Sequence, residues 1–178
     1  NTYGPTGMET DSPVTITGIS GEASEMERVT LTIDMLSDNA NHVGDGGGLP
    51  ALIDGKVNTY YHTKWNAPVT TEAHYVQIKL NKPLKDLCFE YDARQSGVNN
   101  GGDVKAATIY GSMNGEFFES MGNEEFNLPT TNGGHATAKN NVSGKQAYNY
   151  IRFTPTARRD KDPLDYTVAG SAWWNMSE

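Results

Sequence analysis

Residues 104–121 read VKAATIYGSMNGEFFESM, a stretch with the features of a β-hairpin. Val104–Ser112 and Phe117–Met121 contain the β-branched and aromatic residues that strands favour. Between them stands Asn114-Gly115, a dipeptide that readily adopts the positive φ angles of tight hairpin turns. The stretch therefore predicts two antiparallel strands joined by a short turn.

Candidate strands separated by turn residues continue on both sides of this hairpin. Val29–Met35 alternates apolar and polar residues, which is the period of a half-buried strand. No segment carries the apolar stripe of period 3.6 that marks a long helix. Further candidate strands are Val14–Thr17, Tyr75–Leu80, Leu84–Tyr91, Tyr148–Thr154 and Ala172–Met176, and turn residues occur at 81–83, 99–102 and 132–134. The pattern predicts an all-β sandwich or barrel whose end loops carry the function.

The composition bounds the domain and its partners. The chain has 178 residues and a formal net charge of −8. Residues 1–27, rich in Gly, Thr, Ser, Glu and Pro, are expected to be a linker or the end of a preceding domain, and residues 28–178 the folded domain. The acidic balance argues against nucleic acid and anionic membranes as partners, because both attract Lys and Arg clusters. The single cysteine, Cys88, is expected to be a buried strand thiol.

The segment from Ala51 to Trp65 offers the first candidate chemistry. Asp54, Asn58 and Thr59 place oxygen atoms in a short turn, and calcium binds six to eight oxygens in loops of this kind. The alternative is an ordinary Asp-Gly turn, in which the Asp54 carboxylate accepts hydrogen bonds from backbone amides. The residues alone leave both interpretations open.

Two further features suit a sugar ligand. His62 and Trp65 lie three residues apart, and an indole stacks on the apolar face of a sugar while an imidazole bonds a hydroxyl. The alternative places Trp65 in the core and His62 on the surface. The loop 92–102 carries Arg94 and three amide side chains, which suit vicinal hydroxyls or a carboxylate; alternatively, Arg94 only pairs with a surface acid. No hydrolase, zinc-protease or phosphate-binding motif is present, so no catalytic residue is predicted.

Four segments together carry a family resemblance. They are Ala51–Thr63, with Tyr61 where tryptophan is usual, Arg94–Gly101, Tyr110–Phe118 and Tyr148–Phe153. In this order they resemble the discoidin domains, also called coagulation-factor type C domains, and most of all the galactose-type carbohydrate-binding modules of bacteria. The resemblance covers residues 29–178 and implies a jelly-roll β-sandwich of the galactose-binding-domain type.

The resemblance also implies a structural calcium ion and its ligands. The positions that match the family's ligands are the Ala51 carbonyl, Asp54, Thr59 and Glu178. One position departs from the pattern, because Lys56 stands where the family often has an Asn or Asp ligand. An ammonium group there is expected to repel or replace the cation.

The glycan pocket that the resemblance implies lies at one end of the sandwich. Its roles fall on His62, Trp65 and Arg94, with Asn100 as a helper and Asp45 as a carboxylate for sugar hydroxyls. We therefore expect a non-catalytic module that binds galactose-type or related glycans. It is expected to sit beside other domains of a secreted, cell-surface or periplasmic protein, as in Bacteroides-like bacteria. The alternative is a protein-interaction or scaffolding module of a cell-surface complex whose sugar site has degenerated.

Overall fold

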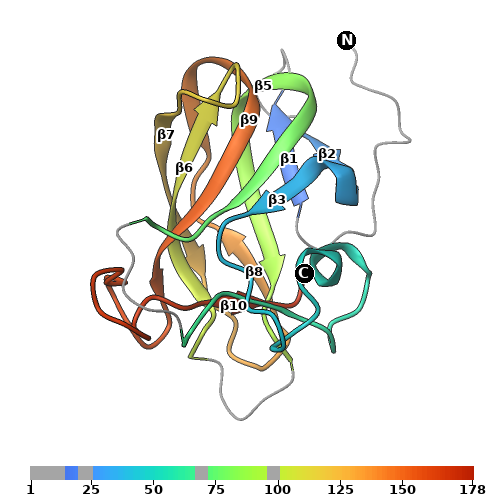
Figure 1. Cartoon of the computed structure of the whole chain (residues 1–178). Helices are drawn as coiled ribbons and strands as arrows, with labels where there is room; N and C mark the ends of the chain where they lie inside the picture. The colour runs from blue at the N-terminus through green and yellow to red at the C-terminus, as the bar shows by residue number, and fades with distance from the viewer. Residues whose placement is uncertain (1–14, 20–25, 67–71, 96–100) are drawn as a thin grey trace.

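The computed structural model describes residues 15–19, 26–66, 72–95 and 101–178. Within these ranges the chain forms short 3₁₀ turns and antiparallel strands, and Figure 1 shows their arrangement. In chain order the elements are β1 (Thr15–Ile19), β2 (Met26–Val29), η2 (Ile33–Met35), β3 (Leu36–Asp38), η3 (Leu49–Ile53), β4 (Tyr61–His62), β5 (Val76–Asp92), β6 (Val104–Ser112), β7 (Glu119–Asn127), β8 (His135–Ala138), β9 (Val142–Arg158) and β10 (Asn175–Met176).

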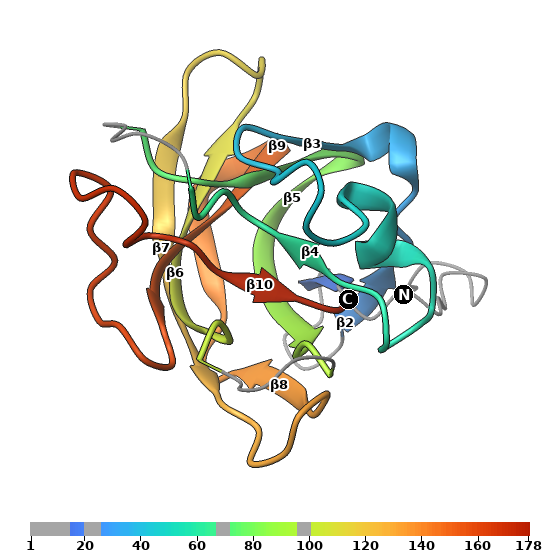
Figure 2. The ribbon, with the colours of Figure 1, turned by 60° about the horizontal axis from the view of Figure 1, so that its bottom comes forward.

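The strands form the two layers of the expected jelly-roll sandwich. Neighbouring strands follow the order β2-β1-β5-β8-β7-β6-β9, and β9 also pairs with β5, which closes the layers on themselves. Both β5 and β9 are long, and register shifts occur where they pair, so each strand bends and serves both layers. A separate pair, β4 with β10, crosses one end of the sandwich (Figure 2).

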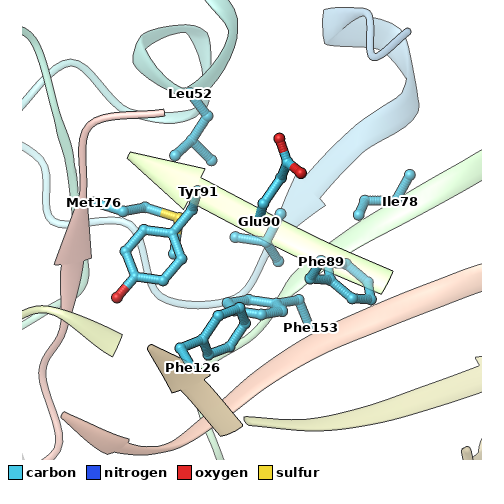
Figure 3. Close-up of a pocket in the computed structure, with 9 residues that line it drawn as sticks. Leu52, Ile78, Phe89, Glu90, Tyr91, Phe126, Phe153 and Met176 are labelled. Atoms are coloured by element: carbon cyan, nitrogen blue, oxygen red, sulfur yellow. The ribbon is translucent and has the colours of Figure 1, made fainter. Parts of the chain in front are cut away.

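Aromatic side chains fill the space between the layers. The rings of Phe89 and Phe153 lie 5.4 Å apart between centroids, and Phe126 and Tyr91 pack beside them (Figure 3). These rings, with Leu52 and others, line a void of only about 20 Å³. Such a space holds one water molecule at most, so this void is too small for a ligand.

The structure corrects three expectations about the strands. Val29–Met35 is not one strand, because β2 ends at Val29 and Ile33–Met35 forms a 3₁₀ turn. Residues 81–83 do not separate two strands, since β5 runs through Pro83 at a register shift. Regular structure also starts before residue 28, because β1 lies within the expected linker and pairs with β5. Val14 and Asn100 lie outside the described residues.

Candidate functional site

Three segments distant in sequence meet at one end of the sandwich (Figure 2). They are the segment after β3, strand β4 and strand β10. The segment after β3 joins β4 through hydrogen bonds from the His42 amide to the His62 carbonyl, 2.9 Å, and from the Gly47 amide to the Tyr60 carbonyl, 2.8 Å. On its other side β4 pairs with β10, and His62 lies opposite Asn175. The backbone thus fixes the residues of all three segments at one rim.

A hollow of about 380 Å³ opens at this rim. It is lined by Asp45, His62, Trp65, Gly170 and Trp173. Trp65 is 44% exposed, whereas His62 is only 5% exposed, so an indole at the mouth stands beside an imidazole at the floor. The hollow combines one apolar face with polar groups, which is the combination that a sugar ring requires.

Asp45 orients the aromatic side chains around the hollow. Its Oδ1 accepts a 2.5 Å hydrogen bond from the Tyr60 hydroxyl, and its Oδ2 accepts a 2.7 Å bond from Nε1 of Trp65. Burial raises the pKa of Asp45, but these two hydrogen bonds, together with the nearby His62 and Arg94, outweigh it and lower the pKa below 3.8. The carboxylate is therefore charged at neutral pH, with one aromatic donor on each oxygen.

The Trp65 indole is held from behind as well as by its N–H. The ring of His42 stacks on it, with 4.8 Å between centroids and 11° between planes. Gly46 allows the intervening loop to close over Tyr60: its φ is +92°, and a side chain there would meet the Tyr60 carbonyl at 2.6 Å. The loop therefore presents the half-exposed indole in one orientation.

His62 is a neutral acceptor at the floor of the hollow. Burial lowers its pKa below 6.5 despite the opposing effects of the Thr63 carbonyl and of Asp45. Its Nδ1 lies 2.6 Å from the Thr63 carbonyl oxygen, which can only accept, so Nδ1 carries the proton. The lone pair on Nε2 is then available to accept a hydrogen bond from a ligand hydroxyl.

Arg94 is not among the residues that line the hollow. Its guanidinium carbon lies 3.7 Å from the centroid of the Tyr60 ring, and its charge contributes to the low pKa of Asp45. The structure thus brings Asp45, His62 and Trp65 together at the hollow, with Arg94 stacked on the Tyr60 ring beside them. Asn100, the fifth residue of the expected pocket, lies outside the described residues. The glycan-binding roles of these residues stay predictions.

Trp173 is a lining residue that the sequence interpretation missed. Its ring stacks with His62 at 5.4 Å between centroids, and the guanidinium carbon of Arg158 lies 3.9 Å from its centroid. Arg158 is buried and also donates to the carbonyls of Ser171, 2.5 Å, and Trp173, 2.9 Å. Tyr60 and His42 were missed as well. The only sequence signal for Trp173 was its place in the candidate strand Ala172–Met176.

Tyr61 does not contribute to the hollow, although it replaces the family's usual tryptophan. Its side chain is fully buried, its hydroxyl donates to Asp38 at 2.8 Å, and its ring packs against Trp174. The departure at this position is therefore a change in the core and not a sign of a degenerate pocket.

Of the four residues expected to hold calcium, Asp54, Thr59 and Glu178 lie together at one turn, and Ala51 lies nearby in η3. Asp54 accepts hydrogen bonds from the Lys56 amide, 2.9 Å, and the Thr59 hydroxyl, 2.6 Å. Glu178 accepts a second bond from the Lys56 amide at 2.5 Å. Ala51 is buried in η3, three residues before Asp54. The amide bond to Asp54 is the one expected of an ordinary Asp-Gly turn, and the calcium ligands stay predictions.

The turn brings two carboxyl groups together, those of Asp54 and Glu178. Oε1 of Glu178 is buried and has no N–H or O–H donor among the described residues. Burial, followed by the proximity of Asp54, raises the pKa of Glu178 to about 8. Two adjacent carboxyl groups with an unpartnered oxygen are what a divalent cation would stabilise. No group of three or more His, Cys, Asp or Glu side chains within the described ranges could hold a metal ion.

Comparisons with known proteins agree with this architecture. A family model, the F5/8 type C domain, matches residues 37–173. The search of curated proteins gives no match. The solved domain CpGH89CBM32-5 from Clostridium perfringens, in complex with GalNAc-β-1,3-galactose, is 20% identical, with a TM-score of 0.52 over 80% of this chain and 90% of that one.

Two other solved structures share the fold. The C-terminal domain of a chitobiase from Bacteroides fragilis is 19% identical, with a TM-score of 0.55 over 83% of this chain and 93% of that one. The CBM32-1 and CBM32-2 domains of Clostridium perfringens ZmpB, in complex with GalNAc, are 14% identical, with a TM-score of 0.53 over 93% of this chain and 38% of that one. The sandwich, its closed sheet and the family match lead to one assignment: the chain belongs to the F5/8 type C, or discoidin, domain family.

Proposed function

We propose that this domain is a non-catalytic carbohydrate-binding module that holds galactose-type glycans in the hollow formed by Asp45, His62, Trp65 and Trp173. The observation that carries the proposal is the half-exposed Trp65 indole, fixed at the mouth of a polar hollow by Asp45 and His42. The indole would stack on the apolar face of the sugar, and Nε2 of His62 would accept from a hydroxyl.

The ligand class is supported by proteins with the same fold. One such domain is solved with GalNAc-β-1,3-galactose and another with GalNAc. One stacked ring and a few hydroxyl contacts give weak binding, on the order of 0.1–1 mM. Neighbouring modules of a secreted or cell-surface bacterial protein would then supply retention through avidity. No helix among the described residues is long and apolar enough to span a membrane.

The engagement of Asp45 supports binding without catalysis. Both of its oxygens accept hydrogen bonds from aromatic side chains, and its pKa is lowered. Glycoside hydrolysis requires two carboxyl groups, one of them with a raised pKa, on either side of the bond to be cleaved. Asp45 is the one carboxylate among the described residues that line the hollow.

We also propose that calcium binds at the turn formed by Asp54, Thr59 and Glu178, with the Ala51 carbonyl. The unpartnered Oε1 of Glu178 supports this site. The ion would tie the turn after η3 to the end of the strand pair β4–β10, and its role would be structural.

A glycan array followed by calorimetric titration tests the glycan site. Trp65→Ala and His62→Ala are each expected to weaken the titrated hits at least tenfold. Val43→Ala is the matched control, because Val43 is exposed on the same loop but does not line the hollow. Unchanged affinity in both site variants would exclude this hollow as the binding site.

A further inference from the structure

A second hollow lies at the other end of the sandwich, beneath the turn between β6 and β7. It measures about 310 Å³, and its lining includes Met113, Phe117, Phe118, Glu119, Gln146 and Tyr148. Figure 1 places this turn at the top of the molecule, opposite β10. The hollow lined by Asp45, His62 and Trp65, called the loop-end hollow below, does not include this turn. The hairpin is nevertheless one of the four segments that carry the family resemblance.

The floor of the second hollow is rigid. Tyr148 is 1% exposed, and its ring fills the space above two glycines. A side chain at Gly111 would approach the Tyr148 ring to 2.3 Å, and one at Gly144 would approach it to 2.4 Å. The phenol is therefore clamped between β6 and β9, and its hydroxyl donates to the carboxylate of Glu119.

The rim of this hollow exposes apolar groups on an ordered turn. Phe117 is 80% exposed and Met113 is 56% exposed. The turn is fixed because Oδ1 of Asn114 accepts hydrogen bonds from the amides of Glu116, 2.9 Å, and Phe117, 3.1 Å. An exposed aromatic ring held by an ordered backbone costs little conformational entropy on binding.

The neighbouring ring is fixed as well. The guanidinium carbon of Arg152 lies 3.9 Å from the centroid of Phe118, and its Nε donates to Gln77 at 2.8 Å. With Phe118 held in this way, the hollow keeps its shape while the Phe117 ring stays open to solvent.

We propose that this second hollow is a binding site for a neutral sugar ring. The Phe117 ring would stack on the apolar face of the sugar, while the Glu119 carboxylate and the Gln146 amide would bond its hydroxyls. The acidic groups Glu116 and Glu119 disfavour anionic ligands. Because the two hollows lie at opposite ends, one domain would join two glycan chains, or two points on one chain, and gain avidity.

Amide chemical-shift mapping with galactose and N-acetylgalactosamine as probes tests the proposal. In the wild type, amides of residues 113–119 should shift saturably, in addition to those around Asp45 and His62. Trp65→Ala should abolish the loop-end shifts and leave the hairpin shifts unchanged. Phe117→Ala should weaken the hairpin response about tenfold, and Phe117→Trp should retain it. Ile33→Ala, which removes an exposed apolar side chain away from both hollows, should change neither response.

The two sites can fail independently. Hairpin shifts without loop-end shifts would support the second hollow and contradict the proposed function of the first. Loop-end shifts alone, with residues 113–119 unmoved at 20-fold the loop-end dissociation constant, would overturn the second site. Concentration-dependent dimerisation that Phe117→Ala abolishes, without sugar-induced shifts at the hairpin, would also overturn it and would assign the exposed ring to self-association.

Discussion

Nε1 of Trp65 donates a 2.7 Å hydrogen bond to Oδ2 of Asp45, across 20 residues of sequence. The other oxygen of the same carboxylate accepts from Tyr60, whose ring carries the guanidinium of Arg94. One partly buried carboxylate thus links the exposed indole to Tyr60 and Arg94. Both this hydrogen bond and the stacking of His42 on the indole orient Trp65.

Asp45→Asn should weaken glycan binding about tenfold, the cost of one charge-assisted hydrogen bond. An amide oxygen can accept from Tyr60 or Trp65, but the amide nitrogen cannot accept from the other. Calorimetric titration with the array hits measures the change. Asp34→Asn, on the exposed 3₁₀ turn η2, is the control and should bind as the wild type does. Equal affinity of Asp45→Asn and wild type would show that Asp45 does not position the indole.

Arg158→Lys should loosen Trp173 and with it the floor of the hollow. A lysine keeps the charge but loses the planar fork that bonds two carbonyls and stacks on the indole. We expect unfolding to become easier by about 2–3 kcal/mol, since a buried charge loses part of its hydrogen bonding, and sugar affinity to fall several-fold. Denaturant titration and calorimetry measure the two effects. Lys105→Met, which removes an exposed ion pair with Asp162, is the control and should leave stability nearly unchanged.

Glu124 should make stability depend on pH in the neutral range. It is fully buried, its Oε1 accepts from the Phe89 amide at 3.3 Å, and burial raises its pKa to about 8. The folded protein therefore holds a proton that the unfolded chain releases above pH 4.5, and stability falls as the pH rises from 4.5 to 8.

Glu124→Gln should remove this dependence, at most about 1.4 kcal/mol per pH unit for one proton. Glu178 titrates in the same window, so the informative quantity is the difference between wild type and variant at pH 5 and at pH 8. The variant should gain stability relative to wild type as the pH increases. A difference that is constant with pH would contradict a protonated Glu124.

Calcium bound at the turn of Asp54 and Glu178 should raise the melting temperature of the protein. The increase should be larger at pH 8 than at pH 6. Glu178 has a pKa of about 8, so a cation must displace its proton at lower pH. Lys56→Asn should strengthen the effect by replacing an ammonium group with an amide oxygen, and Asp54→Asn should abolish it. Lys79→Asn, which changes an exposed side chain of β5, is the control. No change in melting temperature at millimolar calcium in any variant would exclude the site.

The sequence predicted the class of fold because its local signals agree with the tertiary structure. Val104–Ser112 was predicted as a strand and is β6 with the same bounds. Pro83 was misleading: proline usually interrupts a strand, but here it lies where β5 changes its register against β9, so the missing N–H costs no ladder bond. The strand β8, of four residues between glycines and a turn, was too short to be distinguished from a loop.

The site was predictable only in part. Trp65 and His62 could be assigned to one pocket because they lie in the same segment. Asp45 could be added because it lies in a glycine-rich loop. Trp173 could not, because the alternation of the candidate strand Ala172–Met176 does not decide which of two adjacent tryptophans faces the hollow. The structure decides it through burial: Trp174 is fully buried in the core, whereas Trp173 lines the hollow. His42 stacks on Trp65 and Arg158 stacks on Trp173, and no sequence pattern indicates either role.

The most direct test of the glycan site follows the indole N–H resonances of the three tryptophans during titration with N-acetylgalactosamine. Trp65→Phe assigns the Trp65 signal. We predict a saturable shift of Trp65, a smaller shift of Trp173, and none for the buried Trp174, with the same dissociation constant that calorimetry gives. If calorimetry detects heat of binding but the Trp65 resonance does not move, the sugar binds elsewhere and the proposed glycan site is contradicted.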